Sequence, residues 1–316
     1  MSTHIVTGVA GFIASHLAEA LLQQGTEVVG IDNLNDYYDP QLKHNNLVNL
    51  KHYSSFKFIK ADIQELDWRQ LLQSVDVVYH QAGQAGVRAS WGNNFYSYTE
   101  RNINATQTIL EGAKQVKSLK RIVYASSSSI YGDTVTMPTP ETLCPKPVSP
   151  YAITKLAAEH LCWLYQQNFA VPVTALRYFT VYGPRQRPDM AFHKFFKAAI
   201  EKESINIFGD GLQTRDYTFV RDIVAANIAA SKVPKAVGKV FNIGGGSRVT
   251  LLELLDMMEQ VMGQPIERNY LGNAVGDARH TSADISEAQK ILGYAPQVSL
   301  LEGLTQQWHW IKSLYT

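Results

Sequence analysis

The stretch HIVTGVAGFIASHLAEALL, residues 4–22, decides the fold. Gly8 and Gly11 stand between an apolar run that predicts a strand and an amphipathic pattern that predicts a helix. Gly8 permits a tight turn, and Gly11 lets the backbone approach a pyrophosphate at the helix N-terminus, where free N–H groups favour anions. Ala14 takes the place of the third small residue of such a turn. Because glycines also form ordinary turns, the surrounding sequence must decide whether this turn binds a nucleotide.

Three later positions support a dinucleotide. Asp32 ends the second expected strand, where its carboxylate can accept a hydrogen bond from a ribose 2′-hydroxyl and would repel a 2′-phosphate. Asp62 follows the third strand and QAG, residues 81–83, follows the fourth, so both are placed to contact adenine and ribose. The sequence therefore favours NAD over NADP.

Strands and helices alternate through the first half of the chain. Strands buried on both faces are expected at HIVTG, EVVGID, FKFIKAD, DVVYHQAG, RIVYASS and VTALRYF. This alternation predicts an α/β fold, a Rossmann-type doubly wound parallel sheet. After about residue 178 helical patterns separated by loops predict a smaller mixed lobe, and KVFNIGG predicts a late strand of the main sheet. We expect residues 1–178 and roughly 216–247 to form the dinucleotide domain, and residues 179–215 and 248–316 to form the lobe.

Composition excludes several classes of protein. The 316 residues are 45% hydrophobic and 18% charged, with a net charge of +1, which gives no basic surface for nucleic acid. No apolar run is long enough to cross a membrane, and the N-terminus lacks the pattern of a signal peptide. Cys144 and Cys162 are expected to be free thiols, and the nine histidines show no metal-ligand spacing. We therefore expect a cytoplasmic protein without a metal.

The stretch SPYAITKLAAEH carries the reaction chemistry. Ser149 is placed to cap a helix that starts at Pro150, and Tyr151 and Lys155 then share one helical face. A lysine cation and a nicotinamide ring would both favour a phenolate, which could take a hydroxyl proton while hydride leaves for NAD. Ser127, at the end of the fifth strand, could hold the same hydroxyl. A Tyr–Lys pair alone also fits simple surface packing.

In order along the chain, TGVAGFIASH, SSSSIYG, YAITK and RYFTVYGPR resemble the extended short-chain dehydrogenase/reductase superfamily. The resemblance implies tightly held NAD, a catalytic set of Ser127, Tyr151 and Lys155, and nucleotide-sugar substrates. It places Arg215 of FGDGLQTRDYTFVRDI on the diphosphate, and Asp277 and Arg279 of GDARHTSADIS near the uridine nucleotide. The full expected cofactor site is Gly8, Gly11, Phe12, Ile13, Asp32, Asn33, Asp62, Ile63, Gln81, Ala82, Gly83, Asn102, Tyr151, Lys155 and Tyr178.

Three stretches, DNLNDYYDPQLK, HQAGQAGVRAS and RYFTVYGPRQRPDM, resemble the UDP-glucuronate 4-epimerases. That resemblance implies that Tyr151 removes the 4-hydroxyl proton while hydride passes from C4 to NAD. The 4-keto sugar then turns within the site, and hydride returns to the opposite face, so NAD is regenerated in each cycle.

A glucuronate oxidised at C4 is a β-keto acid that loses CO₂ when its carboxylate bond aligns with the carbonyl π system. Arginine forks and hydroxyl groups can hold a carboxylate out of that alignment. Arg187, Thr180, Ser128 and Ser129 are the candidates, whereas Arg185 meets either phosphate or the protein surface, and the sequence does not separate the two arginines. The expected substrate site also includes Arg88 and Phe208, the latter from NIFGDG, which packs either on uracil or within the lobe.

Alternative reactions depend on the same positions. Related 4,6-dehydratases carry an Asp-Glu pair where this chain has Ser128 and Ser129, and related decarboxylases carry an acidic residue at Ser129. The main rival is a UDP-glucose or UDP-N-acetylglucosamine 4-epimerase, and the alternative of another class is a non-catalytic NAD-sensing scaffold. The helices that contain YAITKLAAEHLCWLY and YSYTERNINATQTIL are apolar on more than one face, and superfamily members often pair these helices. We therefore expect a homodimer.

Overall fold

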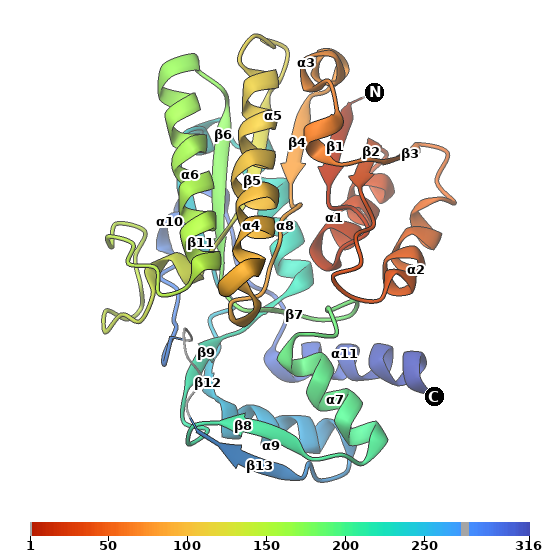
Figure 1. The fold of residues 1–316 in the computed structure, drawn as a ribbon, viewed down its shortest axis with the longest axis vertical. Helices are drawn as coiled ribbons and strands as arrows, with labels where there is room; N and C mark the ends of the chain where they lie inside the picture. Colours follow the sequence, from red (N-terminus) through yellow and green to blue (C-terminus); the bar gives the residue numbers. More distant parts are fainter. Residues whose placement is uncertain (1, 273–277) are drawn as a thin grey trace.

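The computed structural model describes residues 2–272 and 278–316 (Figure 1). A seven-stranded sheet forms its centre, with the strand order β11-β6-β5-β4-β1-β2-β3 and parallel pairing throughout. The strands are β1 (Thr3–Thr7), β2 (Glu27–Asp32), β3 (Phe56–Lys60), β4 (Val77–His80), β5 (Arg121–Ser127), β6 (Val173–Tyr178) and β11 (Val240–Ile243). The order reverses between β1 and β4, where such sheets bind ligands. The predicted Rossmann-type doubly wound sheet is confirmed, including its late strand.

Helices cover both faces of this sheet. One face carries α1 (Phe12–Gln23), α2 (Pro40–Leu50) and α8 (Val220–Lys232), whose buried apolar side chains join one large core. The other carries α3 (Trp68–Leu71), α4 (Phe95–Tyr98), α5 (Ala105–Ala113) and α6 (Pro150–Phe169). Figure 1 shows α4, α5 and α6 side by side on this second face. The central strands are therefore buried on both sides, which explains their continuous apolar runs. The edge strand β3 is not, because its lysines are exposed, so the expectation of burial on both faces is wrong for FKFIKAD.

The C-terminal lobe lies below the carboxyl ends of the strands (Figure 1). Its helices are α7 (Ala191–Glu201), α9 (Leu251–Met262) and α11 (Leu300–Tyr315), which match expected helical patterns. The short α10 (Ser286–Leu292) instead lies beside β11 and α8 of the main sheet (Figure 1). Its strand pairs are β7 (Val181–Tyr182) with β10 (Thr218–Phe219), β8 (Ile205–Phe208) with β13 (Arg268–Leu271), and β9 (Thr214–Asp216) with β12 (Arg248–Thr250). These strands of two to four residues are too short to leave a periodic pattern in the sequence.

Two further sequence expectations concern helices and thiols. Across residues 2–272 and 278–316, no helix combines the length and the apolar character needed to cross a membrane. Cys144 is exposed and Cys162 is buried, and both are free thiols as expected.

Candidate active site

The turn between β1 and α1 is built for close backbone approach. Gly8 has φ +69°, and a Cβ there would lie 2.9 Å from the Cα of Ala82. Gly11 caps α1 without any side-chain hydrogen bond, so the first-turn N–H groups, which include those of Phe12 and Ile13, point along the helix start. Ala14 is buried beneath the turn. These residues fit a pyrophosphate of a dinucleotide.

Asp32 is held at the end of β2. Its two carboxylate oxygens accept hydrogen bonds from the backbone N–H groups of Ala10 (3.1 Å) and Leu34 (2.8 Å). Burial raises the pKa of Asp32, and these hydrogen bonds and the Lys43 charge oppose the rise. Its neighbour Asn33 donates to Asp62 at 2.7 Å, which ties the end of β2 to the segment after β3. The carboxylate is thus fixed in orientation at the sheet edge.

The segment after β4 has a mixed role. A Cβ at Gly83 would lie 2.8 Å from Oδ1 of Asn102, so glycine is needed for this contact. The side chains of Gln81 and Tyr178, in contrast, are engaged with Asn227 of α8. These two expected cofactor residues therefore use their side chains in packing. Ile63 is buried in the core beside α3.

Ser127, Tyr151 and Lys155 come together at the carboxyl end of β5. Ser149 caps α6 by accepting a hydrogen bond from the N–H of Ala152 at 3.2 Å, and Tyr151 and Lys155 follow on the helix as the sequence predicts. The Ser127 hydroxyl is hydrogen bonded to the Tyr151 phenol. The Lys155 ammonium lies 4.7 Å from the centre of the Tyr124 ring.

A π-helical segment, η5 (Thr99–Asn104), supports this arrangement. Asn102 lies in it and donates to the Thr154 hydroxyl at 2.8 Å, and that hydroxyl donates to the carbonyl oxygen of Tyr151 at 2.8 Å. Such π-helical turns are frequent at functional sites. The sequence expectation placed Asn102 at the cofactor, and it did not foresee this link to α6.

The electrostatics of the pair differ from the sequence expectation. Burial raises the pKa of Tyr151, and the Ser127 hydrogen bond and the charge of Arg187 oppose the rise. Burial lowers the pKa of Lys155 to about 8, against the charge of Glu159. Among the side chains that act on Tyr151, the cation that favours the phenolate is therefore Arg187 on the YGPRQRPDM loop.

On the YGPRQRPDM loop, Arg185 and Arg187 have different surroundings, which the sequence could not predict. Arg185 has φ +64° and turns toward α1, where it pairs with Glu19 at 2.6 Å. Gln186 points into the protein, is 1% exposed and accepts a hydrogen bond from Gln307 of α11 at 2.8 Å. Arg187 pairs with Asp189 at 2.9 Å, and its charge acts on Tyr151. The position of Arg185 favours its protein-surface alternative over substrate binding.

The remaining expected substrate residues lie in two groups. Arg88 stacks on Phe208, with the guanidinium carbon 4.3 Å from the ring centre. Arg215 donates to the carbonyl oxygen of Arg279 at 3.0 Å, and Arg279 pairs with Asp210 at 2.8 Å. The half-buried Ser128, Ser129 and Thr180 lie close to the catalytic residues in the chain, directly after β5 and β6. Asp277 lies outside the described residues.

Sequence reasoning missed three polar residues near this centre. Asp189 accepts two hydrogen bonds from Arg187, one from Nε and one from Nη2, each at 2.9 Å. The hydroxyl of Tyr37 is hydrogen bonded to Asp189 and to Tyr98. The signal was available, because Asp189 belongs to YGPRQRPDM and Tyr37 to DNLNDYYDPQLK, two of the stretches singled out above.

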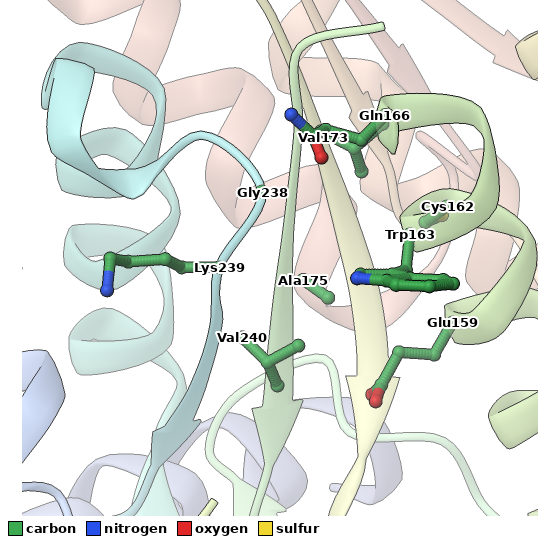
Figure 2. Close-up of a pocket in the computed structure, with 9 residues that line it drawn as sticks. All are labelled: Glu159, Cys162, Trp163, Gln166, Val173, Ala175, Gly238, Lys239 and Val240. Carbon is green, nitrogen blue, oxygen red and sulfur yellow. The ribbon is translucent and has the colours of Figure 1, made fainter. Parts of the chain in front are cut away.

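A groove on the other side of α6 is separate from this centre. Figure 2 shows it between α6, β6 and the segment before β11, with Trp163 and Glu159 on the helix side and Val240 on the strand side. Burial raises the pKa of its Cys162 thiol. A thiol held in its neutral form is a poor nucleophile, so Cys162 is a packing group, as expected.

Comparisons with known proteins agree with this geometry. Residues 4–244 match the model of the NAD dependent epimerase/dehydratase family. The chain belongs to this family. Its membership confirms the predicted resemblance to the extended short-chain dehydrogenase/reductases, and the family's NAD dependence agrees with the cofactor prediction.

Individual family members extend the likeness over the whole chain. A UDP-glucuronate 4-epimerase of Thermodesulfobacterium geofontis is 40% identical over 316 residues, which cover 99% of this chain and 97% of that protein. A Bacillus subtilis protein described as an uncharacterized UDP-glucose epimerase is 42% identical, with 98% of each chain covered. The crystal structure of the Bacillus cereus UDP-glucuronic acid 4-epimerase with UDP-glucuronic acid and NAD has a TM-score of 0.96 and 45% identity, and covers 99% of this chain and 100% of its own.

Proposed function

We propose that this protein is an NAD-dependent UDP-glucuronate 4-epimerase that interconverts UDP-glucuronate and UDP-galacturonate. The observation that carries the proposal is the Arg187 guanidinium, which is fixed on Asp189 in a loop that Gln307 holds in place, and whose charge acts on Tyr151. A cation at this point suits a sugar that carries a carboxylate beside its reacting carbon. The two relatives named as UDP-glucuronate 4-epimerases, at 40% and 45% identity, support the same activity.

The described residues fit NAD. The glycine turn and the start of α1 would hold the pyrophosphate, Asp32 the adenosine ribose, and Lys155 the nicotinamide ribose. When bound, NAD supplies the hydride acceptor and donor for C4 of the sugar. Because the Asp32 carboxylate would repel a 2′-phosphate, NAD is preferred over NADP.

Tyr151 is the proposed general base and acid. The phenolate takes the 4-hydroxyl proton as C4 is oxidised, and the phenol gives it back when C4 is reduced. Ser127 orients both the phenol and the sugar hydroxyl, as its hydrogen bond to Tyr151 indicates. The N-cap and the Asn102–Thr154 hydrogen bonds fix the first turn of α6, so that Tyr151 keeps its place through both half-reactions.

The sugar carboxylate is proposed to bind Arg187, with the hydroxyls of Thr180, Ser128 and Ser129. The chain carries no acid at positions 128 and 129. A carboxylate side chain there would repel the uronate or serve as the acid–base pair of a dehydratase. Hydroxyl groups can instead donate hydrogen bonds to the substrate carboxylate before and after the keto sugar turns.

The rest of the substrate is proposed to bind the lobe. Arg215 and Arg279 would contact the diphosphate and nucleotide, together with Asp277, and Phe208 with Arg88 would contact the uracil end. We retain the proposed division into a dinucleotide domain, residues 1–178 and about 216–247, and a nucleotide-sugar lobe, residues 179–215 and 248–316. A substrate that spans both parts would place its sugar at Tyr151.

A second candidate is a UDP-glucose 4-epimerase, which the name of the Bacillus subtilis relative favours. It would use the same three catalytic residues but leave Arg187 without a sugar carboxylate. Incubation with UDP-glucuronate, UDP-glucose or UDP-N-acetylglucosamine, followed by NMR, separates the two. UDP-galacturonate formed without added NAD is the expected result. Turnover of UDP-glucose alone would reject the uronate, and no turnover of any sugar by protein shown to contain NAD would favour a non-catalytic scaffold.

We also propose that the protein acts as a homodimer in the cytoplasm. Large apolar side chains are exposed on α4, the segment before it and α6, which lie on one face of the molecule (Figure 1). They are Trp91, Phe95, Tyr96, Ile153, Trp163, Leu164 and Phe169. A patch of this kind suits a helix-to-helix contact between two copies. A monomeric mass by light scattering at working concentration would contradict the dimer.

A further inference from the structure

The Arg187 guanidinium is held by a neighbouring carboxylate. Its Nε and Nη2 atoms donate to the two oxygens of Asp189, each at 2.9 Å, in a two-point fork. Burial opposes the ionisation of Asp189, but the Arg187 charge and hydrogen bonds outweigh it and hold the pKa of Asp189 below its usual value. Within residues 2–272 and 278–316, the hydrogen bonds of Arg187 come from Nε and Nη2, and Nη1 makes none. The Nη1–Nη2 end therefore offers two donors to a second carboxylate while Asp189 keeps the other side.

Asp189 is itself held from the far side of the site. The Tyr37 hydroxyl donates a hydrogen bond to it and is also hydrogen bonded to the Tyr98 hydroxyl. Tyr98 donates to the carbonyl oxygen of Gly86 at 2.8 Å, and its ring centre lies 6.3 Å from that of Tyr151. The chain of contacts therefore starts at the arginine and ends against the catalytic tyrosine.

Gly86 makes this arrangement possible. It has φ +111°, and a Cβ there would lie 2.5 Å from the Tyr37 hydroxyl oxygen. Tyr37, Gly86 and Asp189 come from three distant stretches of the chain, DNLNDYYDPQLK, HQAGQAGVRAS and RYFTVYGPRQRPDM. These are the stretches on which the resemblance to the UDP-glucuronate 4-epimerases rests, and they meet at one cluster.

We propose that Asp189 and Tyr37 are positioning residues that set the plane of the Arg187 fork and so protect the 4-keto uronate from decarboxylation. The inference rests on the proposed function. In the unwanted step the C5–C6 bond breaks, its electron pair moves toward the C4 carbonyl to give an enolate, CO₂ leaves, and C5 takes a proton from water. The product is a UDP-4-keto-pentose, and the hydride removed earlier from C4 stays on the nicotinamide. This step requires the C5–C6 bond to align with the carbonyl π system.

A fork fixed on one side cannot rotate with the carboxylate. Because an arginine guanidinium is planar and rigid, holding Nε and Nη2 on Asp189 also fixes the plane in which Nη1 and Nη2 point. A carboxylate bound to that end takes the plane of the fork. With Asp189 neutral or Tyr37 absent, the guanidinium gains rotational freedom, and the carboxylate reaches the reactive alignment more often.

The test uses Asp189→Asn and Tyr37→Phe in the NAD-containing enzyme, with Tyr38→Phe as the matched control from the same loop. UDP-glucuronate is supplied, and NMR measures the ratio of UDP-4-keto-pentose to UDP-galacturonate. We expect Asp189→Asn to raise this ratio by about tenfold, the factor for losing one charge-assisted hydrogen bond. Tyr37→Phe should raise it by a smaller factor, and Tyr38→Phe should leave it at the wild-type value.

A merely structural role would lower the rate without moving the ratio. An unchanged ratio in both Asp189→Asn and Tyr37→Phe overturns the inference. If Asp189→Asn does not fold, as shown by its thermal unfolding and NAD content, Tyr37→Phe alone decides. Failure of the proposed function is a different result, because then the wild type itself converts no UDP-glucuronate.

Discussion

Replacement of Arg187 by alanine should remove the preference of this site for a charged sugar. The guanidinium has a two-donor end available for the substrate, since Asp189 occupies only Nε and one bond of Nη2. Truncating one partner of a buried, hydrogen-bonded charge pair costs about 2–5 kcal/mol. Affinity for UDP-glucuronate should therefore fall by about 30-fold to about 4,000-fold, since each 1.4 kcal/mol is a factor of ten.

The assay compares the binding of UDP-glucuronate and UDP-glucose by calorimetry, which does not require turnover. Arg187→Ala should lower the affinity for UDP-glucuronate by the factor given above. The affinity for UDP-glucose should stay within about threefold of the wild-type value, the scale of a surface substitution. Arg185→Ala is the matched control, because the Arg185 charge is directed to Glu19 on α1. That variant should keep the preference for the uronate.

Equal losses of affinity for the two UDP-sugars would refute the reasoning. Arg187 would then bind the diphosphate or have a structural role. Removal of Arg187 also leaves Asp189 without its cation, so the unfolding free energy of each variant must be measured beside the binding data. If Arg185→Ala also loses affinity for UDP-glucuronate, in proportion to its loss of unfolding free energy, the effect of Arg187→Ala would reflect stability and the reasoning would fail as well.

Three further predictions concern the reaction and the fold. Tyr151→Phe should abolish epimerisation yet retain NAD by chromatography of the released cofactor; appreciable turnover would remove Tyr151 from the base role. Glu159→Ala should destabilise the protein to urea by about 3–5 kcal/mol, because it strands the buried Arg177 that Glu159 binds at 2.6 Å; a cost below about 1 kcal/mol would match an exposed pair instead. Burial lowers the pKa of His16 to about 4, so its neutral form stabilises the fold fully above about pH 6.5, and that stability is lost as the pH falls toward 4. Between pH 7 and pH 5 the wild type should lose about 2 kcal/mol more than His16→Gln in urea unfolding; identical losses would argue against this.

The sheet and the dinucleotide end could be predicted because each depends on short stretches of sequence. Gly8 and Gly11 act through their own backbone, and Asp32 is the last residue of its strand. Strand periodicity and glycine placement are local features, so they can be recognised without knowledge of the tertiary structure.

The roles of Arg185 and Arg187 could not be predicted, because they depend on distant contacts. The side on which each arginine lies follows from the left-handed conformation of Arg185 and from Gln186, which is bound by Gln307 in the last helix. The pKa of Tyr151 has a similar origin, since burial raises it and a loop arginine, rather than the lysine one helical turn away, opposes the rise. Such effects appear only when segments far apart in sequence are placed together.

The fate of the hydrogen on C4 tests the central claim most directly. The protein as purified, without added NAD, is given UDP-glucuronate that carries deuterium at C4, and the product is followed by NMR and mass spectrometry. We predict UDP-galacturonate that retains the deuterium at C4, because the hydride removed from one face of the sugar returns to the other. UDP-galacturonate without the label, or no conversion by protein that contains NAD, would contradict the account.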